Sequence, residues 1–273
     1  MKIILGIAQL RKIIAEYKLD NHKISFVPTM GSLHDGHLSL VKYAIDNSDK
    51  TIVSIFVNKA QFNDENDYQL YPKDYNRDID KLKNLNPDIV FIPDINEIYE
   101  HDFAVKISLT KYQDCLCGKS RIGHFDGVAI IITKLFNLVK PNVAIFGEKD
   151  FQQLLIIKKL VKDLNFDIEI IALPTMREAS GLAMSSRNSR LSIKARIKAS
   201  LIFQTLNEIR ENPSLIENKK KELISAGFEK IDYLEIRSEN DLKLIKDINS
   251  KDEKRIFIAI YLEGIRLIDN IKI

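Results

Sequence analysis

The sequence contains no tryptophan, only two cysteines and no long apolar run. Cys115 and Cys117 are one residue apart, which strains a disulfide, and two thiols are too few for a structural zinc site. We therefore expect both to be reduced thiols that serve packing. No apolar stretch approaches the roughly 18 residues of a membrane helix, and the first segment, unlike a signal peptide, carries charges within its apolar period. These absences predict a cytoplasmic protein without a membrane partner.

The sequence also lacks a large excess of charge of either sign. The chain has 41 basic and 38 acidic side chains, a net charge of +3, spread without long single-sign blocks. A nucleic-acid-binding surface is therefore not expected, and the absence of tryptophan removes one common base-stacking residue. With 273 residues, 45% of them hydrophobic, the chain is long enough for one large domain or two smaller ones.

Short apolar runs alternate with helical patterns over the first 175 residues. The runs are continuous instead of alternating, which is typical of strands buried on both faces, and they cover residues 23–29, 51–58, 88–94, 142–148 and 167–173. Helical patterns lie between them at 38–47, 74–85, 125–139 and 150–164. This alternation predicts a doubly wound, Rossmann-like α/β domain over residues 1–175, with 23–29 as the first parallel strand.

The pattern changes after about residue 174. Two lysine-rich helical stretches, 193–211 and 215–226, precede three neighbouring strand candidates, 231–237, 255–263 and 264–271. Helices followed by adjacent strands predict a small α+β domain over residues 176–273. No internal repeat or low-complexity tract is present.

The stretch "FVPTMGSLHDGHLSLV", residues 26–41, joins the first of these strands to a helix. Open α/β sheets bind ligands at such carboxyl ends of strands, and a helix N-terminus favours anions. Gly31 and Gly36 permit close backbone approach, while His34 and His37 can share one face of the first helical turn. The stretch lacks both the P-loop pattern and the G-x-G-x-x-G pattern, so neither mechanism applies. Two alternatives are that the histidines are surface turn residues or a metal pair.

Two further strand ends carry polar side chains. The amides Asn58 and Gln61 in "FVNKAQFN" can read a hydroxyl and a carboxylate, or they are ordinary loop residues. In "FGEKDFQQL", Gly147 marks the turn, Lys149 is a point charge suited to phosphate, and Asp150 is placed to cap the helix or to bind a ribose hydroxyl. Gln152 or Gln153 follows one turn into the helix.

The segment "GLAMSSRN" follows the last parallel strand. Ser185, Ser186 and Arg187 form a compact set of hydroxyl and guanidinium donors suited to a polyphosphate. As a lone segment it is equally a cap followed by a charged helix. Four polar clusters of complementary chemistry at successive strand ends favour a shared ligand site.

These segments, in this order, resemble the pantothenate synthetase (pantoate–β-alanine ligase) family within the nucleotidylyltransferase superfamily that carries a HIGH-type motif. The resemblance rests on "PTMGSLHDGHLSLV", "FVNKAQFN", "YPKDYNRD", "RIGHFDGVA", "FGEKDFQQL" and "GLAMSSRN", between Pro28 and Asn188. This sequence departs from the family pattern at Lys59 and Ile122, where the family usually has proline.

The resemblance implies ATP-dependent condensation of pantoate with β-alanine through a pantoyl-adenylate, with release of AMP and pyrophosphate. It implies that His34, His37, Lys149, Ser185, Ser186 and Arg187 are catalytic, with His37 a proton donor. The implied ATP contacts are Met30, Gly31, Ser32, Leu33, His34, Asp35, Gly36, His37, Gly147, Glu148, Lys149, Asp150, Met176, Met184, Ser185, Ser186 and Arg187. The implied pantoate and β-alanine contacts are Gln61, Gln153, Asn58, Arg121 and His124.

The resemblance further implies Mg²⁺ on the ATP phosphates, with Asp78 as a weak candidate ligand, and a homodimer in which the second domain acts as a lid. Two rival functions are open. A nucleotidylyltransferase that moves AMP onto a phosphate ester would share the histidine motif but is not expected to carry "FVNKAQF" or "GEKDFQQ". A silent nucleotide-binding module would tolerate loss of Lys149 or Gln153, and both are present.

Overall fold

A computed structural model describes residues 1–273, which divide into two compact units. The first unit contains Met1–Leu109, Gly123–Glu148 and Ile156–Pro174. The second contains Thr175–Ile273 together with two earlier segments, Thr110–Ile122 and Lys149–Leu155. None of the helices combines the length and apolar character needed to cross a bilayer.

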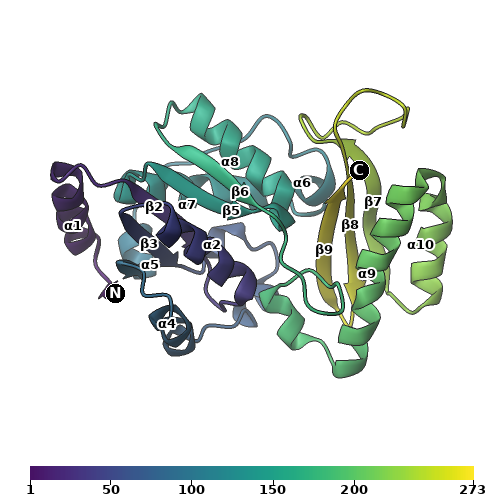
Figure 1. The fold of residues 1–273 in the computed structure, drawn as a ribbon, viewed down its shortest axis with the longest axis horizontal. Helices are drawn as coiled ribbons and strands as arrows, with labels where there is room; N and C mark the ends of the chain where they lie inside the picture. The colour runs from purple at the N-terminus through teal and green to yellow at the C-terminus, as the bar shows by residue number, and fades with distance from the viewer. The chain divides into compact units, whose positions relative to one another are not determined.

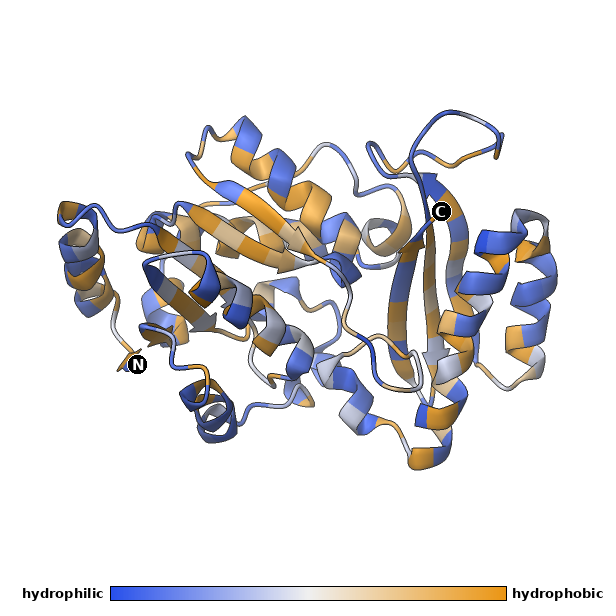
Figure 2. Cartoon of the chain, in the orientation of Figure 1, coloured by the Kyte–Doolittle hydropathy of each residue, from blue (hydrophilic) through white to orange (hydrophobic).

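The first unit is built on a parallel sheet of six strands, which confirms the doubly wound α/β class (Figure 1). The strands are β1 (Lys2–Ile4), β2 (Ile24–Thr29), β3 (Lys50–Ile55), β4 (Ile89–Phe91), β5 (Val143–Gly147) and β6 (Glu169–Leu173). Their order in the sheet is β1-β4-β3-β2-β5-β6. Most of their residues are apolar (Figure 2). The strands β2 to β5 are buried along nearly their whole length, whereas the edge strands β1 and β6 are more exposed.

The expectation that residues 23–29 form the first strand is wrong, because β1 precedes them. β1 has only three residues and pairs with β4 alone, at the edge of the sheet. It leads within three residues into helix α1 (Ile7–Leu19), whose helical pattern dominates this stretch of sequence. A strand this short gives no periodicity of its own, so only its pairing reveals it.

Helices cover both faces of this sheet. Successive residues of a strand point to opposite faces, so each strand has apolar side chains to bury on both sides. On one face, α2 (Asp35–Asp46) and α4 (Tyr75–Lys83) pack their buried residues against Val27, Val53, Val90 and Ile145. On the other, Phe26 of β2 meets Phe136 of α7 (His124–Val139) edge to face. Two short helices of this unit are α3 (Glu65–Gln69) and α5 (Ile95–Ile98). Helix α8 (Phe151–Asp163) begins in the second unit and continues into the first, and α6 (Leu116–Ser120) lies in the second unit.

The strand order reverses at β2, and this decides where the predicted polar loops lie. β2 pairs with β3 on one side and with β5 on the other, all parallel. The loops that leave the carboxyl ends of β3, β2 and β5 therefore emerge side by side at one edge of the sheet. Such a reversal is where doubly wound sheets form their ligand crevice.

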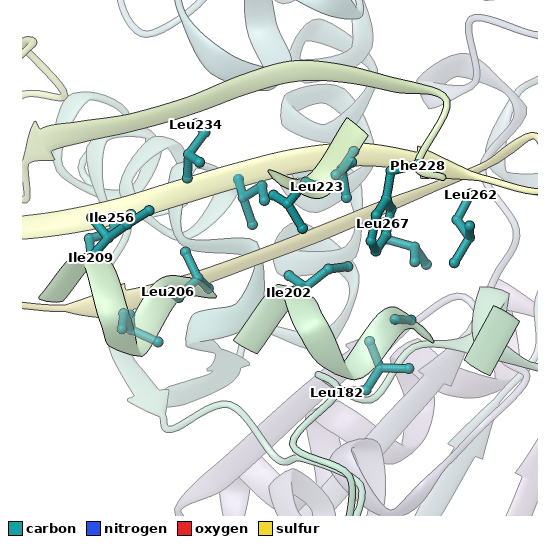
Figure 3. Close-up of a cluster of buried hydrophobic side chains, with 14 of the residues drawn as sticks. Leu182, Ile202, Leu206, Ile209, Leu223, Phe228, Leu234, Ile256, Leu262 and Leu267 are labelled. Atoms are coloured by element: carbon teal, nitrogen blue, oxygen red, sulfur yellow. The ribbon is translucent and has the colours of Figure 1, made fainter. Parts of the chain in front are cut away.

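The second unit contains an antiparallel sheet of β7 (Lys230–Ser238), β8 (Lys254–Leu262) and β9 (Ile265–Lys272), in that order. Helices α9 (Ile193–Glu211) and α10 (Ile216–Ser225) supply the other layer. Ile202, Leu206 and Ile209 of α9 pack against the sheet through Ile256 and Leu267 (Figure 3). The predicted helices and strands of this part are confirmed to within one or two residues at most of their ends.

Candidate active site

The turn after β2 is a backbone structure that requires glycine. The Thr29 hydroxyl donates to the Ser54 carbonyl on β3 at 2.7 Å and accepts the Gly31 N–H at 3.2 Å. Gly31 and the following Ser32 have positive φ angles of 77° and 49°. A Cβ at Gly31 would lie 2.8 Å from the Asp78 carboxylate. Only glycine combines this dihedral with so close a neighbour.

His34 and His37 are joined at the start of α2. His34 is the N-cap residue, and its backbone N–H donates to Nδ1 of His37 at 3.3 Å. The two rings stack with centroids 4.0 Å apart and a tilt of 33°. Because Nδ1 of His37 accepts a hydrogen bond, the proton of its neutral imidazole is assigned to Nε2. The arrangement gives His37 an N–H donor at a helix N-terminus, where the peptide dipoles favour an anion.

The side chain of Asp78, on α4, holds the backbone of the turn that precedes α2. Its two carboxylate oxygens accept the backbone N–H groups of Ser32 and Leu33, each at 2.7 Å, and the residue is only 2% exposed. Lys81, one turn further along α4, donates to the Leu33 carbonyl. Burial raises the pKa of the Asp78 carboxyl, while the two backbone donors act in the opposite direction. Side-chain groups of α4 therefore hold the unusual backbone of the histidine turn.

The contacts of Asp78 bear on its predicted role as a magnesium ligand. Both of its oxygens are engaged by backbone donors, and no group of three or more His, Cys, Asp or Glu side chains gathers into a metal site. Magnesium coordination by Asp78 stays a prediction, and the geometry favours the anchoring role.

Replacing Asp78 by alanine is expected to lower the free energy of unfolding by about 2–3 kcal/mol, because two buried N–H groups lose their charged acceptor. The matched control is Asp80→Ala on the same helix, whose exposed pair with Lys83 is expected to contribute about 0–1 kcal/mol. Urea unfolding of both variants measures the difference. Equal losses would contradict the anchoring role, and a variant that is stable but needs more Mg²⁺ for activity would support the metal role.

The amides predicted after β3 lie together, and both side chains are buried. Asn58 is 1% exposed, and its amide donates to the Gly127 carbonyl at 2.8 Å and to Gln61 Oε1 at 3.2 Å. Its own oxygen accepts the Tyr99 hydroxyl at 2.9 Å. Burial raises the pKa of Tyr99 to about 12, so this donor stays protonated. Asn58 thus has partners for its amide and carbonyl and orients Gln61, whose Nε2 lies 2.9 Å from the Met30 sulfur.

Helix α7 fixes the same loop from the other side. The His124 ring lies 2.6 Å from the Gln61 carbonyl through Nδ1 and is 6% exposed. A Cβ at Gly127 would stand 2.2 Å from the Ala60 carbonyl, so the helix can approach only with glycine there. Lys59, one of the two departures from the pattern noted in the sequence, opens a 3₁₀ turn (Lys59–Gln61) and pairs with Glu65. Packing against α7 therefore shapes this loop without a proline.

The turn after β5 leads into the second unit. Gly147 ends the strand, a 3₁₀ turn covers Glu148–Asp150, and α8 begins at Phe151. The Lys149 ammonium lies 3.7 Å from the Asp150 carboxylate, and its side chain is 19% exposed. The Lys149 carbonyl accepts the Asn270 side-chain amide at 2.8 Å.

The structure distinguishes the two glutamines that follow. Gln152 is 5% exposed and binds the backbone of the preceding loop, donating to the Tyr112 and Cys115 carbonyls and accepting the Cys117 N–H at 2.9 Å. Gln153 is half-buried. The pantoate contact predicted for Gln153 stays open, whereas Gln152 is a structural residue.

Both cysteines lie in this loop as free, buried thiols. Burial raises the pKa of Cys115 to about 11, and the Cys117 sulfur lies 3.1 Å from the Tyr233 hydroxyl. Their surroundings fit the packing role expected from the sequence. Cys117 lies in α6, and Arg121 is the C-cap residue of that helix and is half-buried.

The last polar cluster is organised by a backbone hairpin. The Met184 N–H donates to the Met176 carbonyl at 3.0 Å, and Arg177 pairs with Ala183 in an antiparallel bridge. The Ser185 hydroxyl then accepts the Arg187 N–H at 3.3 Å and caps the 3₁₀ turn Ser186–Arg190. Met176 and Met184, eight positions apart, are thereby held opposite each other beside the serines.

Three polar residues of the second unit were not selected from the sequence. Arg177, Asp269 and Asn270 hold the hairpin and the Lys149 segment to strand β9. One signal in the sequence could have indicated them: Asp269 and Asn270 interrupt the otherwise apolar run "RLIDNI". Polar side chains in a buried strand are costly unless they have partners.

The structure therefore gathers the predicted residues into two sets. In the first unit, three neighbouring strands end at one sheet edge, and the predicted residues at or after these ends are His34, His37, Asn58, Gln61 and Gly147. In the second unit, Lys149 and the hairpin of residues 176–184 are both attached to β9. The first set offers an imidazole donor and amides, and the second offers an ammonium group and hydroxyls.

Comparison with known proteins identifies the family of this chain. The family model described as pantoate-beta-alanine ligase matches residues 2–272. The pantothenate synthetase of Thermosipho africanus is 42% identical over 99% of both chains, and that of Thermotoga petrophila is 45% identical over the same shares.

Solved structures give the same result. The crystal structure of pantothenate synthetase from Thermus thermophilus superposes with a TM-score of 0.92 at 35% identity and covers 100% of this chain and 99% of that chain. Pantoate-beta-alanine ligase from Francisella tularensis, solved with beta-gamma ATP and beta-alanine, gives a TM-score of 0.87 at 39% identity, covering 100% and 97%.

Proposed function

This chain belongs to the pantoate–β-alanine ligase family, and we propose that it condenses pantoate with β-alanine to pantothenate at the expense of ATP. The enzyme is a carbon–nitrogen ligase that releases AMP and pyrophosphate. The observation that carries this proposal is the histidine turn, where an imidazole donor stands at a helix N-terminus at the reversal point of the sheet.

In the first step a carboxylate oxygen of pantoate attacks the α-phosphorus of ATP. The bond from that phosphorus to the bridging oxygen breaks, and pyrophosphate leaves with the electron pair. His37 donates from Nε2 to a phosphate oxygen, and His34 stands beside it as the second imidazole. Lys149, Ser185, Ser186 and Arg187 supply further positive charge and donors to the phosphates. Catalysis here is alignment and charge stabilisation.

The remaining predicted contacts divide between the nucleotide and the acids. Gln61 and Gln153 bind pantoate, with Asn58 and His124 fixing the loop of Gln61. The nucleotide lies along 30–37, 147–150 and 184–187, with Met176 beside it. Arg121, in the segment before α7, is a further contact to pantoate or β-alanine.

In the second step the amine of β-alanine attacks the acyl carbon of the pantoyl-adenylate. The bond to the AMP oxygen breaks, AMP leaves, and the amine proton passes to solvent. No enzyme nucleophile is needed, which agrees with the buried, protonated state of Cys115. The adenylate must be kept from water until the amine arrives, which suits a lid formed by residues 176–273.

Magnesium enters this scheme as part of the substrate. The side chains present do not assemble a protein-built cage, so Mg²⁺ is carried by the ATP phosphates, as its preference for oxygen ligands and retained water allows. The proposal also includes a cytoplasmic homodimer, which the family resemblance implies.

The function is tested by measuring AMP and pyrophosphate released from ATP and Mg²⁺ with pantoate, with and without β-alanine. We expect turnover that needs both acids, and pantoate-dependent exchange of pyrophosphate into ATP when β-alanine is omitted. Addition of excess EDTA is expected to stop both reactions. A folded, ATP-binding protein with no pantoate-dependent reaction would assign the site to another acceptor or to binding alone.

A further inference from the structure

We propose that Asp269 and Asn270, adjacent residues of the last strand β9, are positioning residues that set the two nucleotide-binding segments of the second unit. The inference rests on the proposed function, since it takes Lys149 and the hairpin of residues 176–184 to contact ATP. Neither residue lies in a motif that resembles the family's ATP contacts, and neither is argued to touch the nucleotide.

Asn270 fixes the backbone from which Lys149 projects. Its Nδ2 donates to the Lys149 carbonyl at 2.8 Å, and its Oδ1 accepts from Arg255 at 2.5 Å. The Arg255 guanidinium in turn stacks over the Phe151 ring at 4.0 Å from its centroid. Asn270 is 3% exposed, so its amide is locked in one orientation by two bonds of opposite sense. Residues 149 and 151 are thereby held at two points to the strands of the sheet.

Asp269 fixes the hairpin through Arg177. The Arg177 guanidinium binds both Asp269 oxygens, at 2.6 Å and 3.0 Å, in a bidentate pair. The same guanidinium donates to the Gly181 carbonyl at 3.1 Å and lies 3.8 Å above the Phe203 ring of α9. Arg177 follows Met176 directly and pairs with Ala183, which precedes Met184. One buried carboxylate therefore ties the hairpin that carries both methionines to strand β9.

The two residues work from opposite faces of one strand. Asp269 stands opposite Ile258 in the sheet register, on the face that packs against α9, as Leu267 does in Figure 3. Asn270 stands opposite Phe257, whose ring contacts Phe151 on the other face. Strand β9 is thus a rigid spacer between the Lys149 segment and the hairpin. A strand hydrogen-bonded along its length holds such a spacing more precisely than a loop does.

Stability alone does not explain this pair. Burying a carboxylate and an amide within an apolar sheet costs desolvation, and apolar residues of similar volume at such sites are often neutral or stabilising. Hydrogen bonds from the polar pair fix the orientation of the Lys149 segment and of the hairpin. Apolar contacts have no preferred direction and would not fix it. The polar atoms are placed where the proposed reaction requires alignment.

Two near-isosteric variants test the inference. Asn270→Asp keeps the acceptor for Arg255 and removes the donor to the Lys149 carbonyl, while Asp269→Asn weakens the bidentate pair with Arg177. Each is expected to weaken binding of α,β-methylene-ATP with Mg²⁺, measured by calorimetry, by about tenfold or more, since a misplacement of about 1 Å can cost 10²-fold in rate. The KM for ATP should rise, and the KM for pantoate should stay within about twofold of wild type.

The matched control is Ile258→Val, which removes one methyl group directly opposite Asp269 without touching a polar contact. It should lower the melting temperature while leaving analogue binding unchanged. If both polar variants bind the analogue as wild type does, whatever stability they lose, the two residues serve only the fold and the inference fails. If one polar variant does not fold, the other decides the outcome. Because analogue binding needs no pantoate, the result stands apart from the activity assay that tests the proposed function.

Discussion

Replacing Lys149 by alanine is expected to slow pyrophosphate release from ATP and pantoate by about 10²- to 10³-fold, the range typical for loss of one group that stabilises transition-state charge. The physical reason is the position of the ammonium group. It stands at the end of β5, its side chain is largely buried, and its backbone carbonyl is fixed by Asn270. A charge held in place before the reaction costs no reorganisation when negative charge moves onto pyrophosphate.

The loss should fall on one half-reaction only. Aminolysis of added pantoyl-adenylate involves no departing pyrophosphate, so Lys149→Ala is expected to perform it within about threefold of wild type. The matched control is Lys158→Ala, an exposed lysine of the same helix α8 that lies outside the predicted site. Single-turnover measurements of both half-reactions separate the effects. A Lys149→Ala enzyme equally slow in both steps would indicate a folding or domain defect, and one that is unimpaired would remove Lys149 from the phosphate site.

Changing His37 is expected to have the second largest effect. His37→Ala removes both the Nε2 donor and the acceptor for the His34 N–H, so adenylate formation should fall by about 10²-fold or more. His37→Gln separates the two roles, because a glutamine at the third helical position can reach back to the N-cap N–H as in a capping box. We expect the glutamine variant to melt close to wild type and still to lose most of the activity.

Thermal unfolding and pre-steady-state release of pyrophosphate measure these two roles. His101→Ala, at an exposed histidine outside the site, is the control and should change neither quantity. Recovery of nearly full activity in His37→Gln would mean that the imidazole serves mainly to cap α2. Loss of fold in His37→Ala with an active glutamine variant would give the same answer.

Sequence patterns predicted the framework of both units. Continuous apolar runs indicated β2 to β6, and the helical periods indicated α2, α4, α7 and α8, because burial on both faces or on one stripe is written directly into residue order. The change after residue 174 indicated the helices and strands of the second unit. β1 escaped notice because three residues carry no period, and the pairing with β4 that stabilises it is a non-local property.

The site was predicted as a set of residues but not as a set of roles. Asn58 and Gln61 look equivalent in sequence, yet Asn58 is enclosed by Gln61, Gly127 and Tyr99. Gln152 and Gln153 are adjacent, yet Gln152 binds the loop that contains the cysteines. A side chain that serves the fold and one that faces a ligand have the same chemistry, and only their neighbours distinguish them.

The sequence by itself determined the class of fold, the segments that carry the chemistry and the family to which they point, since each is encoded in local order and composition. The tertiary structure alone decided that Asp78 holds the histidine turn and that Asp269 and Asn270 hold the segments around Lys149 and Met176. These contacts join residues 45 to 121 positions apart. Hydrogen bonds depend on distance and direction, and no local pattern in the chain records which distant donor a buried carboxylate or amide will meet.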